Sequence, residues 1–124
     1  MRHRVSTGSP FEPRIGFSRA VRVDRHVFVA GTAPVWPEGD VPDDVGMQTQ
    51  RCLQIIEDAL REAGAELEDV VRTRIYLVDR ADADAVAEVH GAVFGDIRPA
   101  STMVVVAGLL DPRWRVEIEA QAVT

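Results

Sequence analysis

Two helical segments that alternate with strand-length apolar runs constrain the fold of this chain more than any other feature of its sequence. The first spans about residues 43–64, where Asp43 and Asp44 offer capping oxygens and Gly64 provides a stop. Its apolar side chains recur every three or four residues, at Cys52, Leu53, Ile56, Ala59, Leu60 and Ala63. The second runs from about Asp82 to Phe94 and carries a stripe of Val86, Val89, His90 and Val93. Each helix therefore has one apolar face that can pack into a hydrophobic core.

Strand patterns flank both helices. Residues 18–23 and 27–30 predict a hairpin that turns at Asp24-Arg25, and a long loop covers residues 32–46. The run 70–78 predicts a strand with one apolar face, formed by Val71, Thr73, Ile75 and Leu77. Two further strands follow at 102–106 and 114–122. Because strands joined through a helix run parallel, with right-handed crossovers, we expect an α+β fold with one mixed β-sheet and two helices on one face.

The strand predicted at 102–106 indicates that a second subunit covers part of the sheet. Its residues Met103, Val104, Val105 and Val106 are apolar on both faces, yet two helices can cover only one face of a sheet. An uncovered apolar sheet face is what a second subunit buries. The sequence therefore predicts a homo-oligomer.

Length and charge limit the remaining possibilities. The 124 residues predict one domain over 1–124, in which residues 1–14 form an N-terminal arm without periodicity. Fourteen basic and twenty acidic residues leave a formal charge of −6, which disfavours nucleic acid and anionic membranes as partners. A single cysteine excludes an internal disulfide framework. No membrane span and no apolar signal core are present, so we expect a cytoplasmic protein.

Few residues carry a signal for chemistry. The three histidines lack metal-ligand spacing and no glycine-rich phosphate loop is present, so we expect neither a metal nor another cofactor. Cys52 lies on the apolar face of its helix and is expected to be a small core residue. Glu117 and Glu119 share one side of the last strand, where they could organise water or a cation, or form a solvated strand face. Gly31 could let backbone amides meet a ligand or could serve a turn.

Four segments resemble the signature segments of the RidA (YjgF) family, in the same order and spacing, over about residues 15–123. They are Ile15-Gly16-Phe17-Ser18-Arg19-Ala20-Val21, Val27-Phe28-Val29-Ala30-Gly31-Thr32-Ala33-Pro34, Arg98-Pro99-Ala100-Ser101-Thr102 and Val116-Glu117-Ile118-Glu119-Ala120. The resemblance implies a chorismate-mutase-like α+β fold. It also implies a homotrimer whose sheets form a central barrel, with pockets for small molecules in the clefts between subunits.

The resemblance further implies an activity and its residues. Active members hydrolyse enamines and imines, releasing ammonia and a 2-keto acid. The glutamate that positions water falls on Glu117, and the pocket-lining backbone falls on Ala30, Gly31 and Thr32. An aromatic residue, usually tyrosine, falls on Phe17. The arginine that holds the substrate carboxylate falls on Ser101, so the chain resembles a subgroup without that arginine.

This departure leaves two functions open. A serine hydroxyl replaces a charge-assisted grip on carboxylate worth about 1.5–3 kcal/mol, unless the nearby Arg98 replaces it rather than forming a surface ion pair. We therefore expect an intersubunit pocket for a neutral or weakly anionic small metabolite, without efficient deaminase activity. The alternative is an enamine/imine deaminase, a hydrolase in which Glu117 positions water. Some relatives carry an endoribonuclease label, for which an acidic chain without a basic stripe offers no physical support.

Overall fold

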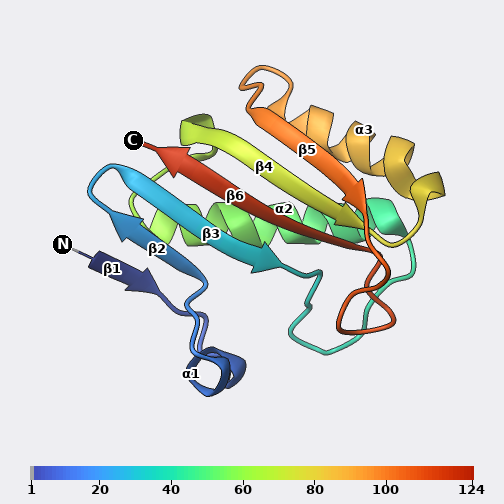
Figure 1. Cartoon of the computed structure of the whole chain (residues 1–124), viewed down its shortest axis with the longest axis horizontal. Helices are drawn as coiled ribbons and strands as arrows, with labels where there is room; N and C mark the ends of the chain where they lie inside the picture. Colours follow the sequence, from blue (N-terminus) through green and yellow to red (C-terminus); the bar gives the residue numbers. More distant parts are fainter. Residues whose placement is uncertain (1) are drawn as a thin grey trace.

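The computed structural model describes residues 2–124, which form one mixed sheet packed against helices (Figure 1). Its strands are β1 (Arg2–Val5), β2 (Ala20–Val23), β3 (His26–Thr32), β4 (Val70–Leu77), β5 (Ala100–Val105) and β6 (Val116–Val123). Its helices are α1 (Phe11–Ile15), α2 (Val45–Glu62) and α3 (Ala83–Phe94), with short 3-10 turns at Leu67–Asp69 and Arg80–Asp82. No helix within residues 2–124 is both long enough and apolar enough to cross a bilayer.

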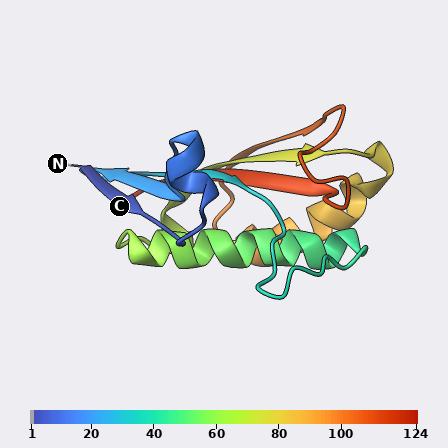
Figure 2. The same ribbon diagram turned by 90° about the horizontal axis from the view of Figure 1, so that it is seen from below.

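The six strands lie in the order β1-β2-β3-β6-β4-β5. All neighbours are antiparallel except β4 and β5, which are parallel and joined through α3. Because β6 pairs antiparallel with both β3 and β4, those two strands run parallel without being neighbours. The long helices α2 and α3 lie on the same side of the sheet (Figure 2), which confirms the predicted α+β arrangement.

Helix α2 follows its sequence signals closely. The Asp44 side chain accepts a hydrogen bond from the Met47 amide at 2.9 Å and caps the helix, while Gly64, just after it, has a φ of 80°. On the outer face, Arg61 pairs with Glu57 at 2.9 Å. The predicted apolar stripe of α2 is buried against the sheet, as is the face of β6 that carries Val116, Ile118, Ala120 and Ala122.

The N-terminal segment differs from its prediction as an arm. Residues Arg2–Val5 form an edge strand that pairs antiparallel with β2, so that Arg4 lies opposite Val21 and Val5 opposite Ala20. Residues Phe11–Ile15 form a short helix that ends at Gly16, whose φ is 94°. The segment lacks periodicity because only Val5 of β1 is buried, and a strand held by backbone pairing leaves little trace in its side chains.

The prediction for one residue of β4 was also wrong. The sequence placed Val71 on the buried face of the strand, but the Val71 side chain is 48% exposed and Val70 is buried instead. The pairing of β4 with β6 shifts register between Val70 and Arg72, so a bulge turns one side chain to the other face. From Thr73 onward, the strand alternates as predicted.

The sheet face opposite α2 and α3 is called the open face below. It carries partly exposed apolar side chains on β3 and on the edge strand β5, where Phe28 and Val104 are each 42% exposed. Between them lie polar and charged side chains of β4 and β6, including Arg74, Tyr76 and Glu119. The exposure of Val104 agrees with the expected uncovered apolar face, whereas a covering partner stays a prediction.

Candidate functional site

The end of β3 and the start of β6 bring Gly31 against Glu117. The pairing of β3 with β6 shifts register between Val29 and Thr32, so the chain bulges at Ala30-Gly31. A Cβ atom added to Gly31 would collide with the Glu117 carboxylate. Because Gly31 has no side chain, the carboxylate lies directly on the backbone of the bulge, and a Cβ here would make the end of the Glu117 side chain move aside.

Thr32 and Ala30 hold this bulge in place. The Thr32 side chain is fully buried, and its hydroxyl donates a hydrogen bond to the Ala30 carbonyl at 2.8 Å. Thr32 therefore supports the site from the core side, and its hydroxyl is engaged by the backbone. Ala30 lines a cavity, as described below.

Arg19 belongs to the same site, although the sequence reading did not single it out. Its Nη2 donates a hydrogen bond to the Gly31 carbonyl at 2.6 Å, and its Cζ lies 5.8 Å from the centre of the Phe17 ring. The Arg19 Nε is buried and has no hydrogen-bond partner among residues 2–124. A signal was available, because Arg19 is a charged residue between Phe17 and the apolar start of β2.

Glu117 lines a cavity of about 350 Å³, called the Glu117 hollow. The residues that line it are Gly31, Tyr76, Val106, Gly108, Leu109, Glu117 and Glu119. Partial burial raises the pKa of the Glu117 carboxyl above its ordinary value, the nearby Arg19 guanidinium opposes this rise, and Glu119 adds to it. A carboxyl group with a raised pKa holds a proton more readily than an exposed one, which suits it to accept and return a proton.

Glu119 is held by neighbours on β4. The Tyr76 hydroxyl donates a short hydrogen bond to the Glu119 carboxylate, and Arg74 Nη1 lies 3.9 Å from the same carboxylate. The hydrogen bond to Glu119 is the main reason that the pKa of Tyr76 is raised, with burial second. The Glu119 carboxylate is therefore held in place by Tyr76 and Arg74. Of the two glutamates on this strand, Glu117 is the less constrained.

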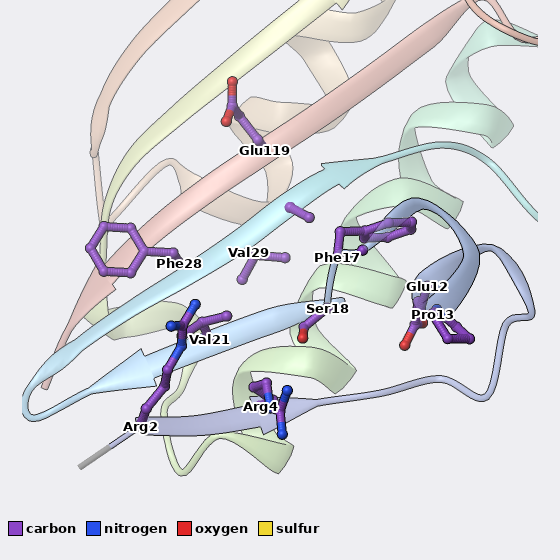
Figure 3. Close-up of a pocket in the computed structure, with 12 residues that line it drawn as sticks. Arg2, Arg4, Glu12, Pro13, Phe17, Ser18, Val21, Phe28, Val29 and Glu119 are labelled. Atoms are coloured by element: carbon purple, nitrogen blue, oxygen red, sulfur yellow. The ribbon is translucent and has the colours of Figure 1, made fainter.

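A second cavity, of about 800 Å³, lies on the open face (Figure 3). We call it the β1–β3 hollow. It is bordered by α1, by the segment 16–18 and by the first three strands, and its lining includes Arg2, Arg4, Phe17, Val21, Phe28 and Ala30. Glu119 lines both cavities. Of the residues expected at the site, Phe17 and Ala30 lie in the larger cavity and Gly31 and Glu117 in the smaller.

Ser101 lies on the opposite side of the sheet. It is paired with Thr73, whose hydroxyl donates a hydrogen bond to the Ser101 hydroxyl at 2.8 Å and also lies 2.9 Å from His90 Nε2. Thr73 is fully buried on the helix face, whereas Glu117 alternates with buried neighbours and faces the open side. Within one chain, Ser101 and Glu117 therefore cannot line one pocket.

Arg98 lies outside both cavities as well. It occupies the turn between α3 and β5 with a φ of 54°, and its amide donates a hydrogen bond to the Phe94 carbonyl at 2.8 Å. Its side chain is exposed, and the ion pairs found within residues 2–124 do not include it. A shared cleft that contains Arg98, Ser101 and Glu117 needs a second chain and stays a prediction.

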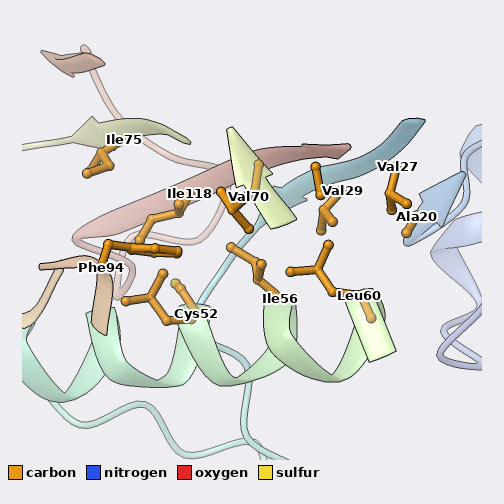
Figure 4. Close-up of a cluster of buried hydrophobic side chains, with 14 of the residues drawn as sticks. Ala20, Val27, Val29, Cys52, Ile56, Leu60, Val70, Ile75, Phe94 and Ile118 are labelled. Carbon is orange, nitrogen blue, oxygen red and sulfur yellow. The ribbon is translucent and has the colours of Figure 1, made fainter. Parts of the chain in front are cut away.

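The remaining candidates are structural. Cys52 is fully buried between α2 and β6 (Figure 4), and burial raises the pKa of its thiol well above the ordinary value, so it is a neutral core residue as expected. Burial lowers the pKa of His90, which contacts Thr73 and the Phe94 ring. No group of three or more potential metal-ligating side chains occurs among residues 2–124.

Known proteins match this chain in sequence and in overall fold. A family model described as Endoribonuclease L-PSP matches residues 7–124. The crystal structure of Rv2704 from Mycobacterium tuberculosis, described as a member of the YjgF/YER057c/UK114 family, is 48% identical, with a TM-score of 0.92 and 100% coverage of both chains.

Two relatives have names that state an activity. The 2-iminobutanoate/2-iminopropanoate deaminase of Mus musculus is 36% identical over 110 residues, which are 86% of this chain and 80% of the relative. The 3-aminoacrylate deaminase RutC of Acinetobacter baylyi is 35% identical over 117 residues, or 93% and 91% of the two chains.

Proposed function

Since the chain belongs to the Endoribonuclease L-PSP (RidA/YjgF) family, we propose that it binds a small metabolite at the Glu117 hollow and is not an efficient enamine or imine deaminase. The observation that carries the proposal is the carboxylate of Glu117, which lies against the backbone of Gly31. The residues of the described chain that line this cavity include no cationic side chain. A neutral group fits beside this carboxylate, whereas a free carboxylate placed there would be repelled.

We also propose that the working form is a homotrimer with the site in a cleft between subunits. Two observations support a second chain at the site. On the open face, Phe28 and Val104 are partly exposed, and contact between such apolar surface and water is unfavourable. Ser101, the counterpart of the family arginine, faces away from Glu117 within one chain, so an edge of another subunit is needed to unite the two positions.

The second candidate is the hydrolase itself, and the retained Glu117 favours it. In that reaction Glu117 takes a proton from water while the water oxygen forms a bond to the imine carbon, and it passes this proton to the nitrogen to give a carbinolamine. Glu117 then takes the proton of the new hydroxyl group and passes it to the nitrogen as the carbon–nitrogen bond breaks, so that a 2-keto acid and ammonia leave. The raised pKa of the Glu117 carboxyl suits both proton transfers. Orientation of the substrate is what this chain lacks, because no guanidinium stands at position 101.

A coupled assay separates the two candidates. The purified protein is added to a pyridoxal-phosphate-dependent dehydratase during turnover, and the release of 2-keto acid from the imine is followed. We expect no acceleration by the wild-type protein. Acceleration that disappears in Glu117→Gln would establish the deaminase and overturn our proposal.

Substitution of Ser101 tests the reason for the missing activity. We expect Ser101→Arg to gain imine hydrolysis, and the double variant with Glu117→Gln to lose it again. Ser101→Gln serves as the matched control, since it adds length and hydrogen-bonding capacity without charge. Equal rates for the arginine and glutamine variants would show that the guanidinium is not what the site lacks.

A further inference from the structure

Three polar side chains form a hydrogen-bonded row from helix α3 to the edge strand β5 (Figure 1). Ser101 of β5 pairs in register with Thr73 of β4, and their hydroxyl oxygens lie 2.8 Å apart. On the other side of Thr73, the Nε2 atom of His90 in α3 lies 2.9 Å from the same Thr73 oxygen. Because Thr73 faces the helices, the row lies on the side of the sheet away from the open face.

Exposure to solvent increases toward Ser101. The Thr73 side chain is fully buried, His90 is half-buried, and Ser101 is exposed at the edge of the sheet. Within residues 2–124, the Thr73 hydroxyl contacts these two neighbours and the Ser101 hydroxyl donates to no other group. Ser101 is therefore the end of the row that can meet a bound molecule.

The number of protons in the row decides its direction. A hydroxyl group carries one proton, and Thr73 donates its proton to the Ser101 oxygen. The contact between Thr73 and His90 therefore needs a proton on Nε2 of the ring. Burial lowers the pKa of His90 and favours the neutral ring, which has one N–H to donate. The proton of Ser101 is then left to point away from the row.

The row makes position 101 a neutral donor. An arginine at this position would offer a charged pair of donors that suits a carboxylate. The Ser101 hydroxyl, held by its acceptance from Thr73, offers one uncharged donor instead. Each hydrogen bond in such a row polarises the next and strengthens it. A neutral acceptor oxygen is the matching group on a ligand.

We propose that His90 is a positioning residue that acts through Thr73 to hold the Ser101 hydroxyl as a hydrogen-bond donor toward the bound metabolite. The class of ligand that follows is a neutral carbonyl compound or carboxamide, whose oxygen accepts from Ser101. This inference rests on the proposed function and names the class of metabolite that the cleft takes. A carboxamide also has N–H groups, which complement the Glu117 carboxylate on the other side of the proposed cleft.

The first experiment locates the proton on His90. Long-range proton–nitrogen correlation spectra of the full-length protein, recorded above the ordinary histidine pKa, show which ring nitrogen is protonated. We expect the proton on Nε2 in the wild-type protein and a mixture of both neutral forms in Thr73→Val, which removes the hydroxyl but keeps the shape. A wild-type ring with its proton on Nδ1 would reverse the row and overturn the proposal.

A matched pair of neutral probes tests the class of ligand. Butanamide and butanethioamide have nearly the same shape and the same N–H groups, but sulfur is a weaker hydrogen-bond acceptor than oxygen. Calorimetric titration of the protein in its solution assembly gives the ratio of the two affinities. We expect Ser101→Ala to reduce the preference for the amide roughly three- to tenfold, as the loss of one hydrogen bond allows.

Variants of the inner residues test whether His90 acts through Ser101. Thr73→Val and His90→Phe, which keeps a ring beside Phe94, should each lower the preference for the amide, and Thr73→Ser should retain it. In a Ser101→Ala background, neither Thr73→Val nor His90→Phe should lower it further. Thr49→Val is the control, because it removes an equally buried hydroxyl that is bonded within α2. Unfolding curves check that each variant is folded, and His90→Phe tests the row independently of the buried Thr73.

Three binding results would contradict the proposal. A wild-type protein that binds neither probe, or a preference that Ser101→Ala leaves unchanged, excludes this class of ligand at Ser101. A preference that falls in Ser101→Ala but not in Thr73→Val or His90→Phe excludes His90 as the positioning residue. The proposed function fails on a separate measurement, acceleration of imine hydrolysis by the wild-type protein, so the two failures are distinguishable.

Discussion

Glu117 is a carboxylate in an environment that opposes its charge. It lies against the Gly31 backbone, is partly shielded from water, and has Glu119 two residues along the same strand face. Arg19 is the cation that offsets these effects, and it is joined to the same glycine through its hydrogen bond to the Gly31 carbonyl. Arg19, which lines neither cavity, therefore partly offsets the rise in the pKa of Glu117 that burial causes.

Removal of the Arg19 charge should shift the titration of Glu117. In Arg19→Gln the carboxylate loses the cation that stabilises its ionised form, so the pKa of Glu117 should rise above its already raised value. The measurement is a pH titration of the side-chain carboxyl carbons by NMR. Arg61→Gln, which removes an equal charge on α2, is the control. An unchanged Glu117 titration in Arg19→Gln would show that the guanidinium is too well screened to matter.

The same shift makes stability depend on pH. Because the pKa of Glu117 is higher in the folded than in the unfolded protein, the folded state binds the proton more strongly. Its contribution to stability is complete below the unfolded pKa and is lost as the pH rises through the folded pKa. Glu117→Gln should remove this loss and be equally or slightly more stable at neutral pH, by at most about 1 kcal/mol. Urea unfolding across pH 4 to 8, roughly the range in which shifted carboxyl groups titrate, measures it.

The close approach at Gly31 predicts that a larger residue there displaces the Glu117 carboxylate. Gly31→Ala should lower the free energy of unfolding by at most about 1 kcal/mol, because the new methyl group meets only the far end of the Glu117 side chain, which can turn away. Gly91→Ala is the matched control. In α3 a Cβ at position 91 meets nothing within 4 Å, and the change should raise stability by roughly 0.5–1 kcal/mol. A much smaller cost of Gly31→Ala in a Glu117→Ala background would identify the collision as the cause.

At the scale of elements, a buried glutamine connects α2 to the strand that carries Glu117. Gln48 is fully buried, and its Nε2 donates hydrogen bonds to the Pro42 carbonyl at 2.8 Å and the Arg113 carbonyl at 3.0 Å. Its Oε1 accepts from the Arg115 amide at 2.8 Å. One side chain thereby joins the long loop, the first turns of α2 and the start of β6.

Gln48→Leu should be costly, since it keeps the size of the side chain but leaves three backbone groups without partners. We expect a loss of about 2–3 kcal/mol in unfolding free energy, measured by urea denaturation. Gln50→Leu, at an exposed position on the same helix, should change stability by no more than about 0.5 kcal/mol. Similar effects of the two substitutions would mean that water replaces the three hydrogen bonds of Gln48 without penalty.

Elements differ in how far local sequence predicts them. Helix α2 could be predicted almost to its ends because its cap, its apolar stripe and its terminal glycine are all local signals. Strand β1 and the bulge at Val70–Arg72 could not. Both exist because of pairing with distant residues, β1 with β2 and the bulge with β6.

At the scale of the whole molecule, the open face predicts self-association. Val104 lies on the open face of the edge strand β5 and is 42% exposed. If a second copy covers it, Val104→Glu places a charge in an apolar interface and should shift the assembly toward single chains of 13.6 kDa. Sedimentation equilibrium measures the mass. Met47→Glu, at an exposed position in the first turn of α2, should leave the mass unchanged, and a wild-type protein that is monomeric at micromolar concentration would refute the assembly.

The sequence by itself determined the class of fold, the helices, most strands, the carboxylate at position 117 and the absence of an arginine at position 101. These follow from local periodicity, local caps and residue identity, which need no tertiary information. Only the tertiary structure decided that Ser101 faces away from Glu117, that Arg19 reaches Gly31, and that Arg2 and Arg4 line a cavity. Strand order and register set those relations, and both depend on pairing between residues up to a hundred positions apart, such as His26 and Val123.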